Sequence, residues 1–294
     1  MSFRSTMRHG VLSSLSAIDR LARREDQLSQ RRVVQVVNFH HMYPREVKSF
    51  RRFLEWFSSH YEVVPYSQAT ASIQAGNVDK SYGAITFDDG LKSIVTAGKV
   101  LAEHNISATF FVCPSIVGEV SPNRLREFCV SARMDYESDE FVSWSDIDVL
   151  KNQHHEIGNH THSHKEIALL NESEIVEELS KAQELLTEKV GAIKHFAWPF
   201  GRFENLGQDA LQPLLNAGFT SIASGERGAH GNFQQTEDKL PLCIRRDNVE
   251  ARWPLGHIKY FLIRNAINPI GCKNWWPDGW NIDSQSTTSS NAKV

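Results

Sequence analysis

Short apolar segments alternate with amphipathic segments along most of this chain of 294 residues. The first apolar segment, VVQVVNF at 33–39, is rich in β-branched residues and predicts a buried strand. The next segment, 45–60, carries apolar side chains at helical spacing and predicts an amphipathic helix. Parallel strands need a crossover of this kind between them. The alternation therefore predicts a parallel sheet with covering helices, either closed as a barrel or open and doubly wound.

The same alternation continues along the chain for seven or so units. We predict further strands at 61–66, 83–88, 108–113, 194–200, 219–224 and 240–245, and further helices at 91–105, 145–153 and 173–191. Residues 115–143 interrupt the pattern, and we expect an inserted loop or small helix over one face there. Such sheets carry their functional side chains at the C-terminal ends of the strands, so a site is expected at those ends.

The composition argues against several classes of protein. Apolar residues make up 40% and charged residues 23% of the chain, and a net charge of −3 gives no reason to expect a nucleic-acid partner. No stretch approaches the roughly 18 apolar residues of a membrane span. The N-terminus lacks the apolar centre of a secretion signal, and the four cysteines form no CxxC pair. We therefore expect a cytoplasmic protein with free, mostly buried thiols.

Two adjacent aspartates end one of the apolar segments. Asp88 and Asp89 follow GAITF and precede Gly90. One of them could cap the helix predicted from Leu91, but capping accounts for one aspartate and not for two. Where the chain turns at the end of a strand, both carboxylates can reach one pocket. A divalent metal on one of them would keep that one ionised and leave the other free as a base.

A histidine-rich segment, HHEIGNHTHSH, occupies residues 154–164. His160 and His164 are four residues apart, so on a helical turn they share one face, whereas His162 points away from the pair. A solvated, histidine-rich turn without a ligand is the alternative. An aspartate and two histidines would leave metal positions open for water and substrate, as a catalytic site requires.

TFDDG and EIGNHTHSH together resemble the first two motifs of the polysaccharide deacetylases, the NodB-homology group called carbohydrate esterase family 4. The resemblance covers roughly residues 33–262 and includes NFHHM, ATFFV, VSWSDIDVL and FAWPFG. It implies an α/β fold, a distorted (β/α) barrel of about seven strands, within one NodB-homology domain at 33–282. The remaining segments would be an N-terminal helical extension at 1–32 and a polar tail at 283–294, which we expect to be disordered.

The same resemblance implies the roles of four residues. Asp89, His160 and His164 would hold a divalent metal, for which we expect Zn²⁺ and leave Co²⁺, Ni²⁺ and Mn²⁺ open. Asp88 would be the catalytic base, taking a proton from water as the water attacks the acetyl carbon. A bound metal lowers the pKa of its water and polarises the amide carbonyl.

Two parts of the family pattern are not met. FAWPFG at 196–201 lacks the arginine that orients the base in many members. Resemblance to the poly-N-acetylglucosamine deacetylases of exopolysaccharides suggests Arg246 as the substitute, and a solvent-facing arginine is the alternative. The family's late Leu-x-His, which supplies the general acid, has only LGH at 255–257 as a match, and that segment predicts the start of a helix. His40 and His41, after the first strand, are the rival donors, and we assign His41.

Aromatic residues near these motifs are candidates for substrate binding. They are Trp198, Pro199 and Phe200 in FAWPF, and Trp144, which resembles the family's pocket-wall tryptophan. A backbone N–H near Trp198–Phe200 would also stabilise the oxyanion. Lone aromatics of this kind are equally typical of a packed core. Three more tryptophans lie nearer the C-terminus, at Trp275, Trp276 and Trp280. We expect them to pack this end of the chain onto the barrel, and sugar binding is the less favoured alternative.

These features predict a metal-dependent N-deacetylase whose partner is an N-acetylated sugar, in a polysaccharide or in a lipid- or nucleotide-linked precursor for cell-surface glycans. Without a secretion signal, the precursor fits better than a finished polymer. The same site acting on a formamide or a cyclic ureide is the enzymatic alternative. A sugar-binding relic would have no reason to keep a base beside the ligands. A 2-His-1-carboxylate iron oxygenase normally has an all-β fold instead.

Overall fold

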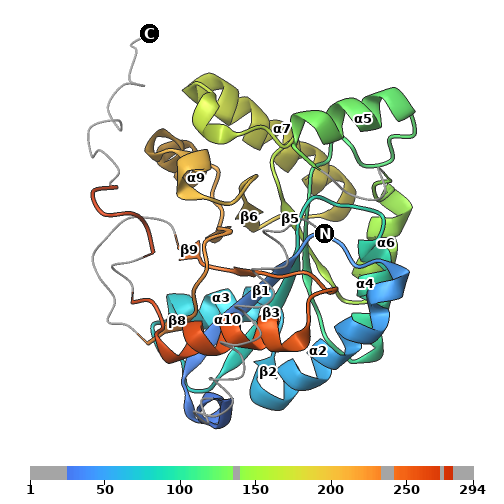
Figure 1. The fold of residues 1–294 in the computed structure, drawn as a ribbon. Coiled ribbons are helices and arrows are strands. Elements are labelled where there is room, and N and C mark those ends of the chain that lie inside the picture. Colours follow the sequence, from blue (N-terminus) through green and yellow to red (C-terminus); the bar gives the residue numbers. More distant parts are fainter. Residues whose placement is uncertain (1–24, 135–139, 233–241, 272–274, 281–294) are drawn as a thin grey trace, which may run out of the picture.

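The computed structural model of the chain describes residues 25–134, 140–232, 242–271 and 275–280. At its centre lies a sheet with the strand order β10-β1-β3-β4-β5-β6-β7-β9 (Figure 1). The strands are β1 (Val33–Phe39), β2 (Glu62–Val63), β3 (Tyr82–Phe87), β4 (Thr109–Val112), β5 (Glu156–Asn159), β6 (His195–Ala197), β7 (Ser221–Ala223), β8 (His230–Gly231), β9 (Cys243–Ile244) and β10 (Asp247–Asn248). All pairs along this order are parallel; β2 also pairs with β3, and β8 runs antiparallel to β1.

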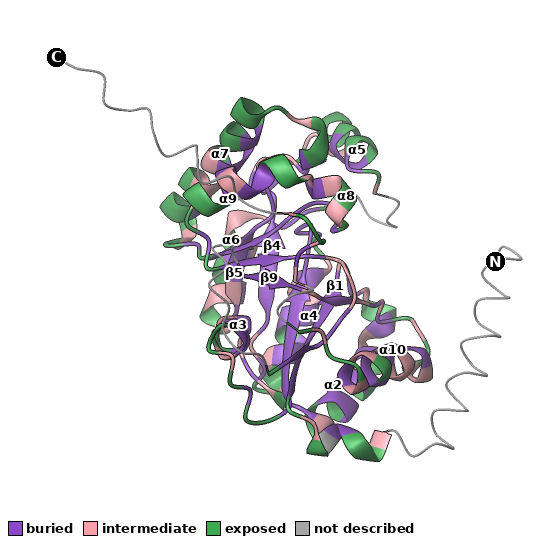
Figure 2. Cartoon of the chain, turned by 90° about the vertical axis from the view of Figure 1, so that its left-hand side faces the viewer, coloured by how far each residue is buried: buried purple, intermediate pink, exposed green. Residues whose placement is uncertain are grey.

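Helices cover the outside of this sheet, and Figure 2 shows the strands buried at the centre with exposed helix faces around them. The α-helices are α2 (Val47–His60), α3 (Tyr66–Gln74), α4 (Ile94–Glu103), α5 (Pro122–Ser131), α6 (Trp144–Asn152), α7 (Glu172–Val190), α8 (Phe203–Leu206), α9 (Leu211–Asn216) and α10 (Leu255–Ile267). Short 3-10 helices lie at Glu25–Gln30, Pro44–Glu46, Ile167–Leu169 and Gln208–Ala210.

The two edges of the sheet meet at one short stretch of chain. β9 pairs with β7 at one edge, and β10 pairs with β1 at the other. Only Arg245 and Arg246 separate β9 from β10, so the chain crosses the seam between the two edges there. The sheet is therefore a nearly closed (β/α) barrel rather than an open, doubly wound sheet, and the order contains eight strands where about seven were predicted.

Alternate residues of one strand enter two different apolar cores. Val34 and Val36 of β1 belong to a small core inside the barrel, whereas Val33 and Val37 belong to the larger core beneath the helices. This division follows from the strand itself, because successive side chains point to opposite faces. Tyr66, at the start of α3, belongs to the inner core and hydrogen-bonds at 3.1 Å to the first residue of β7, so α3 closes the N-terminal end of the barrel. The C-terminal ends of the strands remain for a site.

Some predicted elements differ from the structure in their bounds. The strand predicted at 61–66 is only β2, because Pro65 lies at the N-cap of α3 and cannot continue a strand ladder. The helix predicted from Leu91 begins at Ile94. The interruption at 115–143 contains α5, which packs with Leu91 and Phe141 in a separate small core and so confirms the predicted insertion.

The described end of the N-terminal extension lies against the barrel domain. Glu25 accepts a hydrogen bond of 2.6 Å from Trp56 on α2 and pairs with Lys259 on α10 at 2.7 Å. Residues 1–24 of the helical extension predicted at 1–32, and the predicted tail at 283–294, lie outside the described residues. Three of the four cysteines, Cys113, Cys129 and Cys243, are buried free thiols, and Cys272 also lies outside the described residues.

Within the described ranges, none of the helices has the length and apolar character needed to cross a membrane.

Candidate active site

The turn after β3 brings two carboxylates to the end of the barrel. Asp88 follows the strand directly, and Asp89 and Gly90 both have left-handed backbone conformations, with φ of 75° and 81°. A positive φ is uncommon for an aspartate, and such strained residues cluster at functional sites. Ser93 is the N-cap of α4, so neither aspartate caps that helix. Both carboxylates line the same cavity.

His160 and His164 lie on a loop, so the prediction of a helical turn is wrong. The loop leaves β5 after Asn159, and the backbones of Thr161 and His164 are left-handed, with φ of 63° and 58°. These two turns bring the imidazole rings to 5.1 Å between centroids. His162 does not belong to the resulting group of potential ligands.

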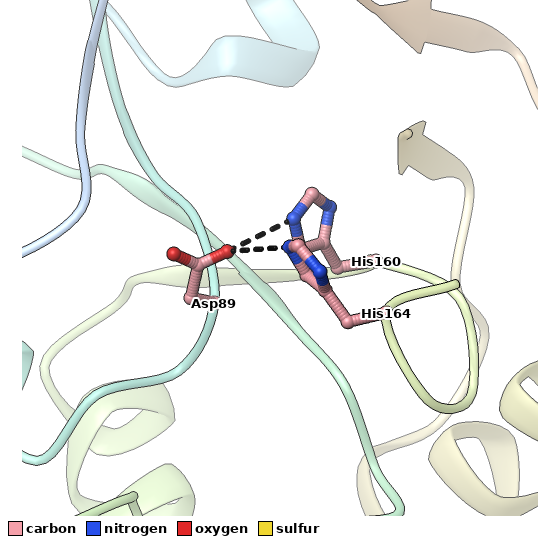
Figure 3. A group of neighbouring side chains, drawn as sticks. All are labelled: Asp89, His160 and His164. Carbon is pink, nitrogen blue, oxygen red and sulfur yellow. Dashed lines mark hydrogen bonds and ion pairs between the residues drawn. The ribbon is translucent and has the colours of Figure 1, made fainter. Parts of the chain in front are cut away.

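Asp89, His160 and His164 converge on one point (Figure 3). Asp89 Oδ1 lies 3.2 Å from Nε2 of each histidine, and one ligand atom from each residue lies within 4.8 Å of the other two. All three side chains are buried. The structure thus brings together the three residues that the sequence suggested as metal ligands.

The donor set of this group fits a divalent metal such as zinc. Imidazole nitrogens and a carboxylate oxygen are common zinc ligands, and three protein ligands leave a position open for water or substrate. The Nδ1–H of His160 donates a 2.8 Å hydrogen bond to the carbonyl oxygen of Ala197, so Nε2, the nitrogen on the Asp89 side, is the atom that would bind a metal. A hydrogen bond of this type orients a metal-binding histidine.

Contacts within the group set its charges. Burial by itself would raise the pKa of Asp89, but hydrogen bonds from His160 and His164 hold that pKa well below its ordinary value. Burial by itself would lower the pKa of His160, but the bond to Asp89 raises that pKa. Asp89 is therefore ionised at neutral pH.

A buried glutamate on α7 holds the histidine loop in place. Glu178 accepts hydrogen bonds from the backbone N–H of Ser163 at 2.9 Å and from its Oγ at 2.7 Å. Within the loop, Thr161 Oγ1 accepts a 3.0 Å hydrogen bond from the N–H of His164. The segment between the two histidines is thus fixed by side-chain contacts on both of its flanks.

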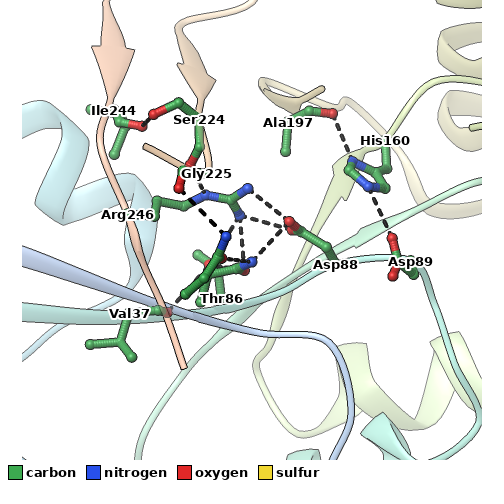
Figure 4. A network of polar contacts seen from close by, with 12 residues as sticks. Val37, Thr86, Asp88, Asp89, His160, Ala197, Ser224, Gly225, Ile244 and Arg246 are labelled. Atoms are coloured by element: carbon green, nitrogen blue, oxygen red, sulfur yellow. Dashed lines mark hydrogen bonds and ion pairs between the residues drawn. The ribbon is translucent and has the colours of Figure 1, made fainter. Parts of the chain in front are cut away.

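Asp88 is bound by Arg246 from the seam of the barrel (Figure 4). The two guanidinium nitrogens of Arg246 lie 2.8 Å from Oδ1 and 2.7 Å from Oδ2, and Asn38 Nδ2 donates to Oδ2 at 3.0 Å. Arg246 is fully buried, so the alternative of a solvent-facing arginine is wrong. Burial would raise the pKa of Asp88, but the charge of Arg246 outweighs it and lowers that pKa. Asp88 is therefore ionised and able to accept a proton at neutral pH.

The two candidate proton donors that follow β1, His40 and His41, lie in different surroundings. His40 lines the cavity beside both aspartates. His41 is instead buried against Glu46, with 3.5 Å between Nδ1 and Oε2, and its ring stacks on Tyr43. The structure does not bring His41 to the site, which corrects our assignment. His257 lies in the first turn of α10, as predicted for LGH, and is not among the lining residues.

The aromatic candidates divide in the same way. Trp198 and Phe200 line the cavity, whereas Pro199 and Trp144 are not among its lining residues. Pro199 is buried, and Trp144 begins α6 and packs against the outer core, so its predicted place in the pocket wall is not met. Phe200 has a φ of 64° and packs edge-on against the ring of His164, with 5.0 Å between centroids.

Trp198 is a core residue that borders the cavity. It is fully buried, and its Nε1–H donates a 2.9 Å hydrogen bond to the carbonyl oxygen of Arg202. Trp276 stacks on it at 6.2 Å between centroids, and Trp280 stacks on Trp276 at 5.8 Å. The tryptophans near the C-terminus therefore pack that segment onto the barrel, as the favoured prediction held.

The site opens into a cavity of about 220 Å³ at the C-terminal ends of the strands. Sequence reasoning missed two polar residues there, Asn38 and Asn248. Asn38 left a signal, because it is a polar residue near the C-terminal end of a strand whose only other polar residue is Gln35. Asn248 lines the cavity from β10 and left none, because only closure of the barrel brings it to the site.

The similarity of this chain to known proteins includes the residues of the site. The family model for polysaccharide deacetylase matches residues 75–221, half of the chain, and that range contains both aspartates and both histidines of the site. A peptidoglycan-N-acetylglucosamine deacetylase of Bacillus cereus is 30% identical over 127 residues, which are 42% of this chain and 38% of that protein. The chain therefore covers well under two thirds of that relative.

Three solved structures share the fold over most of their length. The Streptococcus pyogenes deacetylase PplD in complex with acetate aligns with a TM-score of 0.60 at 14% identity, covering 79% of this chain and 99% of that one. IcaB from Ammonifex degensii gives 0.58 at 18% identity, with 80% and 97% covered. The deacetylase domain of BpsB from Bordetella bronchiseptica gives 0.58 at 19% identity, with 74% and 96% covered. With the family match over the motif-bearing half, the chain belongs to the polysaccharide deacetylase family.

Proposed function

We propose that this protein is a metal-dependent hydrolase that removes an N-acetyl group from a sugar of a polysaccharide or of its lipid- or nucleotide-linked precursor. The observation that carries the proposal is the adjacency of two groups at one cavity. Asp88, bound by Arg246, lies next to the Asp89, His160 and His164 group. The family match supports an N-acetylated glycan as the class of substrate.

The residues of the site divide the steps of an amide hydrolysis. A divalent metal held by Asp89, His160 and His164 would activate water and polarise the acetamide carbonyl. Asp88 accepts the proton of the attacking water at Oδ1, which receives one hydrogen bond from Arg246 whereas Oδ2 receives two donors. This assignment follows because Oδ1 keeps a lone pair for the proton.

Two residues complete the reaction at the cavity wall. The backbone N–H of Phe200, at the left-handed turn beside His164, stabilises the negative charge that develops on the carbonyl oxygen. His40 donates a proton to the nitrogen of the departing amine. The C–N bond then breaks, and acetate and the free amino sugar are released.

Acetate release from N-acetylglucosamine-containing glycans tests the activity. The metal-stripped protein, the zinc- and cobalt-reconstituted protein and the Asp88→Asn variant are compared on polymer, oligosaccharide, lipid-linked and nucleotide-linked substrates. We expect release that depends on the added metal and falls at least about 10²-fold in Asp88→Asn, because the general base is lost. Metal-loaded protein that releases no acetate from any of these substrates would refute the proposal.

The neighbouring histidines provide a matched test of the proton donor. We expect His40→Gln to lower kcat by about 10²- to 10⁴-fold with little change in KM. His41→Gln should leave both constants within about threefold, because His41 faces Glu46 and not the cavity. Thermal melts of both variants report any loss of fold. Equal effects of the two substitutions, at unchanged melting temperature, would contradict the assignment.

A further inference from the structure

Asn38 connects the catalytic pair to the opposite wall of the cavity, and all four of its hydrogen-bonding positions are used. Its Oδ1 accepts from Arg246 at 3.0 Å and from Thr86 at 2.7 Å. Its Nδ2 donates to Asp88 at 3.0 Å and to Asn248 Oδ1 at 2.8 Å. The side chain is fully buried, so each of these contacts replaces water.

The chemistry of Arg246 determines which way the Asn38 amide points. A guanidinium has donors only, so the Asn38 atom beside it has to be the oxygen. The reverse orientation would set the amide nitrogen against Arg246 and the amide oxygen against the carboxylate of Asp88. Both contacts would then be repulsive, so the orientation of Asn38 is fixed.

The fixed Asn38 amide in turn orients Asn248. Because Asn38 Nδ2 donates toward Asn248, the atom that receives this bond is Asn248 Oδ1. The Nδ2 of Asn248 is left on the other side, where Gly225 O lies 3.5 Å away. That distance exceeds the usual 2.7–3.2 Å range for such bonds, so it takes up little of the donor capacity.

Asn248 therefore keeps hydrogen-bond donor capacity at Nδ2. It is half-buried and lines the cavity with His40 and Asp88. In the free protein, water can accept these hydrogen bonds. A ligand that displaces the water and offers no acceptor would leave a buried N–H unpaired, which disfavours its binding.

We propose that Asn248 is a substrate-binding residue, which donates a hydrogen bond to a hydroxyl oxygen of the bound N-acetylated sugar, and that Asn38 is the positioning residue that fixes this donor. The inference rests on the proposed function, since it concerns how the same cavity binds its sugar. This contact would also make the cavity selective for the substituents of the sugar, which the Asp89, His160 and His164 group does not contact. A substrate with an oxygen at this position is favoured over one with a hydrogen or an apolar group there.

A double-mutant cycle tests the contact. The probes are methyl N-acetylglucosaminide and a series of its analogues, each lacking one hydroxyl group. Dissociation constants are measured on the zinc-loaded protein by ligand-observed NMR before hydrolysis proceeds, and kcat/KM is measured separately by acetate release. Wild type is compared with Asn248→Ala and with Asn205→Ala, a control at a half-buried asparagine on α8 that does not line the cavity.

We expect Asn248→Ala to weaken binding of the full sugar by about 2- to 12-fold, as for the loss of one neutral hydrogen bond. One deoxy analogue should bind wild type more weakly by the same factor, and Asn248→Ala should no longer distinguish that analogue from the full sugar. Asn205→Ala should leave every constant unchanged. A purely structural role of Asn248 would instead lower affinity for all probes equally.

The inference is overturned if Asn248→Ala binds as wild type does, if its loss is the same for every analogue, or if wild type binds no member of the series. Its failure is distinguishable from failure of the proposed function. Binding that follows the predicted cycle without release of acetate would support the contact and refute the deacetylase activity. Acetate release with an unaffected Asn248→Ala variant would do the reverse.

Discussion

Arg246 and Asp88 form a buried, two-pronged ion pair although 158 positions separate them in the chain, with nitrogen–oxygen distances of 2.8 and 2.7 Å. Asp88 lies just after β3, and Arg246 lies in the two-residue link that crosses the barrel seam. A planar guanidinium holds a carboxylate in one orientation, which a single ammonium group cannot do. The closure of the barrel thus also orients Asp88, the proposed catalytic base.

Replacing the guanidinium by an ammonium should therefore impair catalysis while charge is kept. We expect Arg246→Lys to lower kcat/KM by about 10²-fold, because a misplaced base loses its approach to the attacking water. Arg246→Met should also reduce the free energy of unfolding by about 3–5 kcal/mol, since it leaves Asp88 buried without its cation. Steady-state kinetics and chemical denaturation measure the two effects.

Arg252→Lys provides the control, because Arg252 is an exposed partner of Glu250 on the surface. This substitution should leave kcat/KM unchanged and should change the free energy of unfolding by no more than about 0.5 kcal/mol, as usual for surface substitutions. Wild-type kcat/KM in Arg246→Lys would show that the bidentate contact does not matter for the reaction.

The Asp89, His160 and His164 group predicts that three neighbouring histidines differ sharply in their effect on zinc binding. His160→Ala and His164→Ala should each abolish stoichiometric zinc, measured by elemental analysis after dialysis, because each removes one of three protein ligands. His162→Ala should retain zinc, since His162 lies outside the group. Removing zinc from wild type with a chelator should lower the melting temperature, because a ligand that binds only the native state stabilises it. Loss of zinc from His162→Ala alone would contradict this ligand set.

Two adjacent glutamates on α7 test the support of the histidine loop. Glu178 is buried and bonded to Ser163, whereas Glu177 is exposed and pairs with Lys181. We expect Glu178→Ala to weaken zinc affinity by about 10- to 100-fold, the range found for residues that orient metal ligands. Glu177→Ala should leave the affinity unchanged. Competition with a chromophoric chelator gives both constants, and equal affinities in the two variants would show that the loop does not depend on Glu178.

His230 predicts a loss of stability in mild acid. Burial lowers its pKa to about 3 in the folded protein, from an ordinary value of 6.5. The unfolded chain therefore takes up a proton below pH 6.5 that the folded protein refuses, so this contribution is fully present above pH 6.5 and falls as the pH drops towards 3. At pH 5 the loss amounts to about 2 kcal/mol.

Urea denaturation of wild type and His230→Gln between pH 7.5 and 5 measures this contribution. The glutamine has no charge to gain, so the difference in unfolding free energy between the two proteins should shift by about 2 kcal/mol in favour of the variant over that range. A pH-independent difference would show that His230 titrates normally in the folded protein.

The sequence by itself determined the parts of this protein that depend on local pattern. Short apolar runs and helical apolar spacing predicted the order of strands and helices, because the strands of a parallel sheet are buried on both faces and each covering helix on one. The motifs TFDDG and HTHSH identified the three residues that the structure brings together as a possible metal site. The parity of β1 would also have separated the two histidines, since His40 continues the face of Asn38 and His41 the opposite one.

Only the tertiary structure decided the relationships that cross the barrel. Whether the sheet closed, which arginine reached Asp88, and which asparagine lined the cavity all depend on strands far apart in the chain meeting at one seam. The histidine pair likewise needed left-handed turns and the hold of Glu178, which a spacing of four residues does not specify. Local patterns encode which face of an element is buried. They do not encode which distant side chain lies opposite it, because that is set by strand register and barrel closure.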